Sequence, residues 1–425
     1  MTDGVLVHQI LNDALMSGAE AAEGFLLHSK TTTIDVKDGA VDTFISASEE
    51  GIGLRLLVEG RLGFAFSSDL QDQALRLMVE EAIRGAKGSA QDPYHCFPRP
   101  FPSYPEVRAY DPHLPMIPVS EKIERARDLE RAAKGFDRRI TKIRHAGYRD
   151  LDFTSFIVIS FVLEVTFSGT FCSVSTYVVA ESDGEAETGF EFDFGRAFHE
   201  LRVEEVGRRA AERAVRKLGA KAIPTGKSDV LLDPAVASEF LGVLALSLTA
   251  ESVHKQKSLL AGRVGQRIGS EKLLVEAGIL RGYLYDSYWA AKDGIASTGN
   301  ARRVSFKTPP ELGPSNLFFE PGLSTRLSSS QASPEVLLQM MGKGLYVVSA
   351  LGMHTANPIS GDFSVGVEGF WVEGGKIAFP VRGVTLAGNV LTLLEKVAEV
   401  GSDLRFYGRT GSPTLFIQDL DIGGL

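Results

Sequence analysis

The sequence predicts an α+β fold with two domains. A helical apolar pattern at residues 4–18 is followed by consecutive strand-like runs and then by an amphipathic helix at 70–87, not by alternating strands and helices. A domain boundary is predicted near residue 222, where a glycine ends a helix and a proline and a new strand follow. We therefore expect an N-terminal α/β-sandwich-like domain with antiparallel strands over 1–222. The glycine-rich, hairpin-dense remainder, 223–425, predicts a β-rich domain, a curved sheet or barrel with flanking helices.

The first elements are predicted from periodicity and turn chemistry. Strand-like runs follow the first helix, and Lys37-Asp38-Gly39 and Glu59-Gly60 supply the turns between them. The helix at 70–87 ends near Gly88, and a proline-rich stretch, 90–118, then predicts an exposed connection. The strand-like runs read GFLLHS, TTTIDVKDG and DTFISASEEGIGLRLLVEGRLGFAFS.

The remaining elements continue the same α+β order. Charged amphipathic segments predict helices at 119–134 and 199–218, with the strands TKIRHAGYRD, TSFIVISF and GTFCSVSTYVVAES between them. The second domain opens with the strand SDVLLD and a helix predicted over 234–254. Alternating strands and loops follow, including a hairpin at Glu373-Gly374-Gly375-Lys376.

Composition narrows the class of protein. The chain has 425 residues with a net charge of −9, which is unfavourable for contacts with nucleic-acid phosphates. Cys96 and Cys172 are its only cysteines, so a reducing compartment fits. No apolar run approaches the roughly 18 residues of a membrane span, and the N-terminus lacks the pattern of a signal peptide. We expect a cytoplasmic protein that binds neither nucleic acid nor membrane.

The segment Ala250-Glu251-Ser252-Val253-His254-Lys255 resembles a zinc-protease helix with parts missing. In HExxH, two histidines four residues apart share one helix face, whereas a spacing of five separates them by about 140° on an ideal helix. Here Ala250 offers no ligand atom, Lys255 brings a positive charge, and His254 lies beside the second ligand position. From spacing alone the segment is an active site, a disabled one or an ordinary helix.

Other metal and nucleophile motifs are weaker. A catalytic zinc site takes three ligands from His, Cys, Asp and Glu, and after residue 222 the chain has two histidines and no cysteine. Carboxylate-only sites for magnesium or calcium stay open, although the sequence has no dense DxDxD cluster. The carboxylates Glu187, Glu191 and Asp193 are interpreted as strand-face charges. The sequence has no G-x-S-x-G motif and no phosphate-binding P-loop.

A second candidate lies in the run HTANPISGDFSVGVEGF. His354, Asn357 and Asp362 crowd one turn, and two interpretations stay open: a tight β-meander, or a peptide-binding edge with these side chains as substrate contacts.

The C-terminal segments carry a resemblance to a known family. NPISGDFSVGVEGFWVEGGKIAFPV, GVTLAGNV and VGSDLRFYGRTGSPTLFIQDLDIGG resemble the closing segments of the TldD/PmbA, or modulator of DNA gyrase, family. The likeness extends to GYLYDSYWAAKDGIASTGNARR, SVHKQKSLLAGRVGQRI and IPTGKSDVLLDP, and more loosely to the N-terminal domain.

The resemblance implies a role for the degenerate motif. TldD-like members carry HExxxH plus a later cysteine and are zinc peptidases, whereas TldE/PmbA-like members lack that set and pair with a TldD-like subunit. The HExxxH positions fall on Ala250, Glu251 and Lys255, and no cysteine follows Cys172. The resemblance therefore implies a metal-free subunit without a cofactor, with zinc only in the partner.

We expect a TldE-like subunit of a peptidase assembly that acts on unfolded or short peptides. Its partner is a TldD-like zinc peptidase or a second copy, and Phe363, Phe370, Trp371 and Phe379 predict an apolar surface for that partner. Two alternatives stay open: a homodimeric metal-dependent peptidase with an unrecognised site, and a modulator of DNA gyrase.

Overall fold

The computed structural model describes residues 3–98, 100, 104–160, 163–273, 278–321 and 332–424. The chain forms two compact units. The first contains Met1–Leu218 and Arg303–Glu311, and the second contains Gly219–Arg302 and Leu312–Leu425. Helices and mainly antiparallel strands build both units, so the predicted α+β class is confirmed. Part of the predicted proline-rich connection, at 99 and 101–103, lies outside the described residues.

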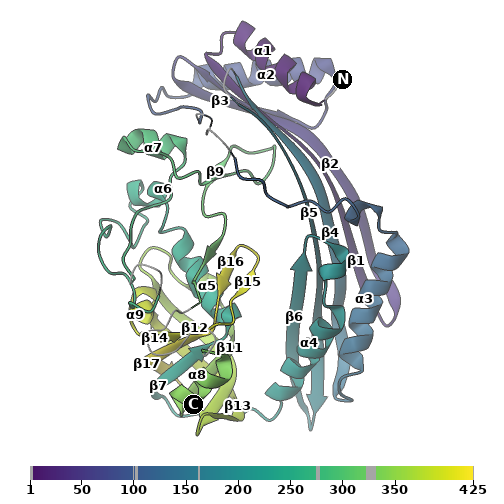
Figure 1. Cartoon of the computed structure of the whole chain (residues 1–425), viewed down its shortest axis with the longest axis vertical. Helices are drawn as coiled ribbons and strands as arrows, with labels where there is room; N and C mark the ends of the chain where they lie inside the picture. Colours follow the sequence, from purple (N-terminus) through teal and green to yellow (C-terminus); the bar gives the residue numbers. More distant parts are fainter. Residues whose placement is uncertain are drawn as a thin grey trace. The chain divides into compact units, whose positions relative to one another are not determined.

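A long six-stranded antiparallel sheet forms the first unit (Figure 1). Asp38 and Gly39 have φ of 50° and 78°, and Glu59 and Gly60 have φ of 53° and 68°, so both predicted turns have positive φ at two consecutive residues. TKIRHAGYRD and TSFIVISF are predicted as separate strands but belong to one, β4, because Leu151, Asp152 and Phe153 between them pair with both β1 and β5. The strand order is β3 (Arg61–Ser67), β2 (Ala40–Val58), β1 (Ala21–Lys37), β4 (Ile140–Ile159), β5 (Leu163–Ser182), β6 (Glu185–Gly195).

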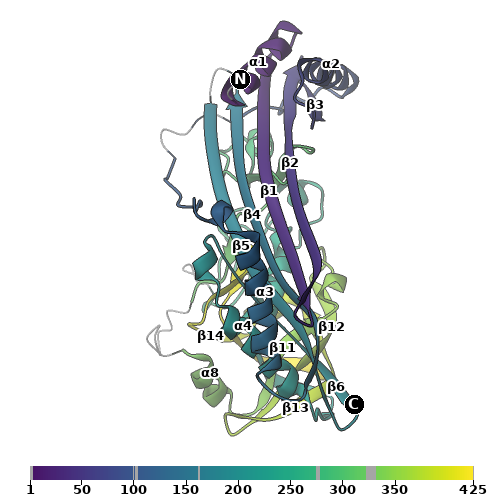
Figure 2. The same ribbon diagram turned by 90° about the vertical axis from the view of Figure 1, so that its right-hand side faces the viewer.

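Helices pack on one face of this sheet, which we call the helix face (Figure 2). Alternation along β1 directs Gly24, Leu26 and Ile34 to that face. Gly24 is required there because a Cβ would lie 2.5 Å from Val7 of the first helix. The helices are α1 (Asp3–Met16), α2 (Asp72–Gly88), α3 (Val119–Lys134) and α4 (Val203–Lys217), with short 3₁₀ turns η1 (Leu114–Met116) and η2 (Phe198–Glu200).

The helix predicted at 199–218 begins later than expected. Phe198–Glu200 forms the separate 3₁₀ turn, and the Glu200 carboxylate accepts the backbone N–H of Arg196 at 2.9 Å. This closes a local turn, so α4 starts only at Val203.

Residues 303–311 pack on the opposite, helix-free face of the first unit. Phe306 is fully buried against Gly51 and Gly53 of β2, where a Cβ would lie 2.3–2.4 Å from Phe306 atoms. Arg303 binds the Glu23 carboxylate, which Arg55 also contacts at 3.1 Å. Glu23 is 3% exposed, so this is a buried three-residue charge cluster.

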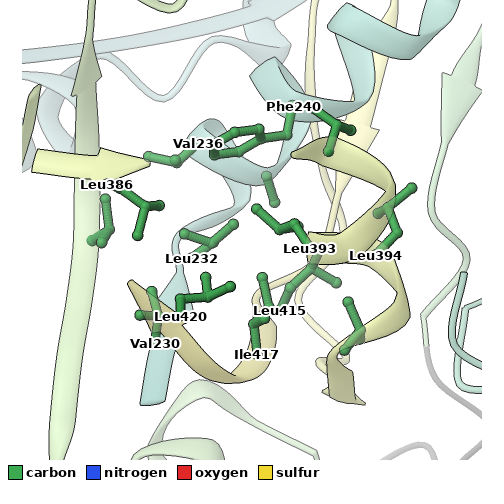
Figure 3. Close-up of a cluster of buried hydrophobic side chains, with 14 of the residues drawn as sticks. Val230, Leu232, Val236, Phe240, Leu386, Leu393, Leu394, Leu415, Ile417 and Leu420 are labelled. Carbon is green, nitrogen blue, oxygen red and sulfur yellow. The ribbon is translucent and has the colours of Figure 1, made fainter. Parts of the chain in front are cut away.

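A closed five-stranded barrel forms the core of the second unit. The order of the whole sheet is β13-β12-β11-β7-β17-β14; β13 pairs again with β17, so the first five strands close the barrel, and β14 extends the sheet from β17. Leu232, Val236, Phe240 and Leu415 lie among the side chains that fill it (Figure 3). The strands are β7 (Gly226–Leu232), β11 (Gly344–Leu351), β12 (Asp362–Glu373), β13 (Lys376–Asn389), β14 (Val397–Val400) and β17 (Leu415–Gly423).

The second unit also contains a hairpin turn, short helices and short strands. Gly374 and Gly375, with φ of 58° and 72°, form the predicted hairpin between β12 and β13. The helices are α5 (Pro234–Ala245), α6 (Ala250–His254), α7 (Ser287–Asp293), α8 (Pro334–Met341) and α9 (Val390–Glu395), with η3 (Met353–Thr355). The short strands are β8 (Ala301–Arg302), β9 (Glu311–Leu312), β10 (Leu317–Phe318), β15 (Arg405–Tyr407) and β16 (Thr410–Ser412).

The continuous helix predicted over 234–254 is wrong, because it is broken at 246–249. The Thr249 hydroxyl donates to the Leu246 carbonyl at 2.8 Å and accepts from the Ser252 N–H at 3.2 Å. A threonine that satisfies the backbone on both sides ends one helix and caps the next. The break sets the direction of α6, which carries the degenerate motif.

The apolar surface expected on the C-terminal strands is not exposed in the second unit. Phe363 and Phe370 are each 5% exposed, and Trp371 and Phe379 pack against the barrel core. These side chains therefore fill their own unit. Among the described residues, no helix combines the length and apolar composition needed to cross a bilayer.

Candidate functional site

The degenerate motif lies on α6, a single helical turn capped by Thr249. Ala250 is 1% exposed, and its N–H donates to the Leu284 carbonyl at 3.0 Å. This position therefore packs into the unit with a methyl group and presents no ligand atom.

Glu251 is held by the lysine of its own motif. The Lys255 ammonium lies 2.5 Å from Glu251 Oε1, and the two side chains are 54% and 37% exposed. In the HExxxH arrangement the glutamate would face a metal-bound water and the second histidine would occupy the position of Lys255. Here the Lys255 ammonium, instead of a metal-bound water, is the partner of the carboxylate among the residues that the structure describes.

His254 contacts α7. Its Nε2 lies 2.7 Å from Asp293 Oδ1, and its ring stacks on Trp289 with centroids 5.0 Å apart. The Tyr285 hydroxyl donates to the other Asp293 oxygen at 2.9 Å. Asp293 therefore joins the end of α6 to the strand-like segment before α7, and His254 is a member of this network rather than a free ligand.

The network has a polar core and an aromatic cover. Burial, reinforced by the hydrogen bond to Asp293, raises the pKa of Tyr285 to about 12, so the phenol is a neutral donor at physiological pH. The Lys292 ammonium lies 5.1 Å from the Trp289 ring centroid. Asp286 caps α7 by accepting the Trp289 N–H at 2.9 Å, which orients the indole toward His254.

The motif residues do not fit a zinc ion. Catalytic zinc needs three side-chain donors, and Ala250 has none, Lys255 is cationic, and His254 is bonded to Asp293. Throughout the described part of the chain, no three His, Cys, Asp or Glu side chains gather closely enough to hold a metal. Glu187, Glu191 and Asp193 instead face α4, as strand-face charges, and pair with its arginines and lysine or with Arg202 just before it.

The second candidate forms a compact turn. Asn357 Oδ1 accepts the N–H groups of Ile359 and Ser360 at 2.9 and 3.2 Å. Asp362 accepts from the Asn389 side chain at 2.8 Å, a bond that lowers the pKa of Asp362. Asn389 also caps α9. The structure thus brings Asn357 and Asp362 together with Asn389.

His354 lies in η3 and is exposed, outside that hydrogen-bonded turn. Asp362 opens β12, which pairs with β11 on one side and with β13 on the other. The ladder between β11 and β12 starts at Gly366 and does not include Asp362–Val365, so the peptide-binding edge expected here stays a prediction. The Ser247 hydroxyl donates to the Pro358 carbonyl at 3.0 Å and joins this turn to the segment before α6.

Sequence reasoning did not single out Tyr285, Trp289 or Asp293. The signal available was Asp286-Ser287-Tyr288-Trp289, an N-cap residue followed by aromatics, which predicts a helix start. Nothing in the sequence links that helix to His254, because the pairing depends on the break before α6.

Three domain descriptions of the PmbA/TldA metallopeptidases match the chain. Domain 1 matches residues 22–86, the central domain 112–218, and the C-terminal domain 225–275 and 271–424. Together these matches span most of the sequence.

Curated relatives and solved structures agree with those matches. The chain is 27% identical to the metalloprotease PmbA of Escherichia coli O157:H7, over 98% of this chain and 96% of that protein. It is 28% identical to a metalloprotease of Methanothermobacter thermautotrophicus, over 93% and 94%. The fold superposes on a putative modulator of a DNA gyrase from Thermotoga maritima with a TM-score of 0.90, 25% identity, and coverage of 99% and 100%.

Proposed function

The chain belongs to the PmbA/TldD metallopeptidase family, and from that premise we propose that it is a non-catalytic, TldE-like subunit of a cytoplasmic TldD–TldE type peptidase assembly. In that assembly a TldD-like partner supplies the zinc site, and the substrates are unfolded or short peptides. This chain contributes architecture and substrate contacts.

One observation carries the proposal: the Lys255 ammonium pairs with Glu251, and the resemblance assigns the position of Lys255 to the second zinc ligand. A zinc peptidase lowers its barrier through a metal-activated water and a polarised carbonyl. A glutamate paired with a lysine, beside an alanine, has no such water to deprotonate. Glu251 and Lys255 pair with each other, and this pairing is consistent with a structural role.

The substrate contacts of this subunit are proposed on the exposed part of the C-terminal turn. His354 is exposed, whereas Asn357 and Asp362 each hold the turn through bonds of their own. We therefore assign His354 the direct peptide contact, and Asn357 and Asp362 the positioning of the loop that carries it.

The likeness to proteins named as modulators of DNA gyrase does not favour a nucleic-acid role for this chain. Its net charge is −9, whereas affinity for phosphates requires a basic surface. The homodimeric peptidase is the alternative that the following experiment separates from the proposal.

The test is a peptidase assay on an unfolded protein and a short fluorogenic peptide. The purified chain, a TldD-like protein from the same genome, and their mixture are each measured with and without a chelator. We expect no chelator-sensitive cleavage by this chain alone, and chelator-sensitive cleavage by the mixture that exceeds that of the partner alone. Elemental analysis of the chain should find far less than one zinc per molecule.

Two variants sharpen the result. Glu251→Gln should leave the activity of the mixture unchanged, because the side-chain partner of Glu251 within the described residues is Lys255. His354→Ala should lower that activity without changing the zinc content of the complex. Chelator-sensitive cleavage by this chain alone, abolished by Glu251→Gln, would overturn the proposal in favour of the homodimeric peptidase.

A further inference from the structure

A serine, a histidine and an aspartate meet on the helix-free face of the first unit, far from the degenerate motif in the sequence. His145 Nε2 lies 2.8 Å from Ser175 Oγ, and His145 Nδ1 lies 3.0 Å from Asp35 Oδ1. These are the distances of a nucleophile, its general base and the carboxylate that orients the base.

The sheet register builds this arrangement. Asp35 on β1, Gly147 on β4 and Ser175 on β5 are direct cross-strand partners, so they form one row across three strands. Neighbouring strands lie about 4.8 Å apart, which leaves roughly 10 Å between Asp35 and Ser175. The imidazole of His145, from the next row, spans that gap and contacts both.

Gly147 makes room for the imidazole. A Cβ at this position would lie 2.5 Å from His145 Cε1 and 2.6 Å from Asp35 Oδ1. Any larger residue would therefore displace the ring from the row. The glycine has a specific role in placing His145 between its two partners.

The carboxylate selects the tautomer of the imidazole. Asp35 Oδ1 is buried and lacks a well-aligned hydrogen bond among the described residues, although Nδ1 lies 3.0 Å away. A small rotation of the ring aligns an Nδ1–H with this oxygen, and a buried unsatisfied carboxylate oxygen favours that rotation. Nε2 is then the bare nitrogen that accepts the Ser175 proton.

We propose that Ser175, His145 and Asp35 form a metal-independent esterase site that acts on esters of hydrophobic carboxylic acids. The site goes beyond the proposed subunit role and does not depend on it. His145 and Asp35 side chains are 38% and 28% exposed, so a small ester can reach Ser175.

An aromatic stripe on β6, formed by Phe190, Phe192 and Phe194, lies beside Ser175 and indicates an apolar acyl group. Phe192 of β6 is the cross-strand partner of Ser175, and its ring stacks on those of Phe190 and Phe194 with centroids 6.0 Å apart. Phe190 is 45% exposed. An apolar chain lying on this stripe places its carbonyl carbon next to the Ser175 hydroxyl.

The chemistry needs only water as co-substrate. Ser175 Oγ attacks the carbonyl carbon while its proton moves to His145 Nε2. The bond to the alcohol oxygen breaks, Nε2 returns the proton to that oxygen, and an acyl-serine remains. Water then attacks the acyl-serine with Nε2 as base, which releases the acid and restores the Ser175 hydroxyl.

The surroundings favour esters over amides. β5 is paired with β4 and β6 on its two sides, so its backbone N–H groups are engaged in the ladders and cannot form an oxyanion hole. Arg149, exposed in the next row of the same face, supplies positive charge instead. This weaker stabilisation suits the lower barrier of an ester.

The test uses the full-length chain, a fluorophosphonate probe and p-nitrophenyl butyrate, all with a chelator present. We expect the probe to add to Ser175, as mapped by mass spectrometry, and butyrate to be released faster than from a free-imidazole control. His145→Ala should lower the labelling rate about 100-fold or more, the usual contribution of a general base. Gly147→Ala should lower it through the displaced ring.

Ser173 is the matched control, since it lies two residues away on the same strand and face and pairs with Arg149 rather than Gly147. Ser173→Ala should leave the labelling rate unchanged, whereas Ser175→Ala should abolish it, with both variants retaining the wild-type circular dichroism. Labelling of Ser175 that His145→Ala does not slow, or that is no faster than labelling of Ser173, would overturn the proposal.

Discussion

The buried charge cluster of the first unit allows a quantitative prediction. The Glu23 carboxylate accepts hydrogen bonds from Nε and Nη2 of Arg55, at 3.2 and 3.1 Å, and also binds Arg303. Its side chain is 4% exposed, and those of Arg55 and Arg303 are 17% and 13% exposed. Replacing Glu23 by glutamine keeps the shape but leaves two buried guanidinium groups without their counter-ion.

The expected cost is about 3–5 kcal/mol, the range for removing one partner of a buried ion pair. Since 1 kcal/mol shifts Tm by roughly 2–4 °C in a domain of this size, Glu23→Gln should lower the Tm of the first unit by about 6–20 °C. Differential scanning calorimetry on the full chain measures that transition.

Glu49→Gln is the matched control, because Glu49 pairs with Lys307 of the same returning segment at 2.6 Å. Both of those side chains are close to half exposed, so their pair should contribute only about 0–1 kcal/mol. If Glu23→Gln lowers the Tm no more than Glu49→Gln does, the reasoning that burial makes this cluster stabilising is refuted.

The same cluster predicts a pH dependence. Burial alone would raise the pKa of Glu23, but the charges of Arg55 and Arg303 outweigh it and hold that pKa below its ordinary value of 4.5. A lowered pKa in the folded state means that the stabilisation is present above about pH 4.5 and is lost as the pH falls through the folded-state pKa. The Tm difference between wild type and Glu23→Gln should therefore shrink in acid.

Four further substitutions test other parts of the structure. Gly63→Ala should lower the free energy of unfolding in urea by about 1–3 kcal/mol, because its Cβ would lie 2.1 Å from the Ala82 carbonyl oxygen. Gly85→Ala, at a position on α2 with open space around it, should raise the free energy of unfolding by roughly 0.5–1 kcal/mol. Asn389→Ala should cost about 0.5–2 kcal/mol through the lost cap of α9, and an unchanged urea midpoint would argue against that cap. The pKa of Tyr285 is raised to about 12, so its contribution to stability is complete below pH 10 and is lost as the pH rises toward 12. Ultraviolet titration should show one phenol that ionises above pH 10, and Tyr285→Phe should remove that transition.

Local sequence determined the elements whose stability depends on near neighbours in the chain. The amphipathic pattern of 119–134 predicts α3, which spans Val119–Lys134. Turn chemistry placed the hairpins at Asp38-Gly39 and Gly374-Gly375, where the structure has positive φ. The resemblance also aligned Ala250 and Lys255 with ligand positions, because residue identity alone decides whether a side chain can bind a metal.

Elements that depend on distant partners were misjudged. The hydroxyl of Thr249 divides one predicted helix into α5 and α6, and His254 at the end of α6 contacts Asp293, a partner that the sequence did not indicate. The stretches predicted as two strands form a single β4 because β5 pairs with it from Ile140 to Ile159 and β1 from Gly147 to Ile159, across the junction of the two stretches. Local periodicity contains no information on either event.

The sequence by itself determined the fold class, the family and the loss of ligand atoms at 250–255. Only the tertiary structure placed residues 303–311 on the first unit, and only it placed Asp35, His145 and Ser175 in contact. Those three residues lie on different strands, and a shift of one residue in register would turn each strand's side chains to the other face. Register is set by the packing of whole strands against the helices, so a contact between residues more than a hundred positions apart follows from the assembled sheet and not from any local pattern.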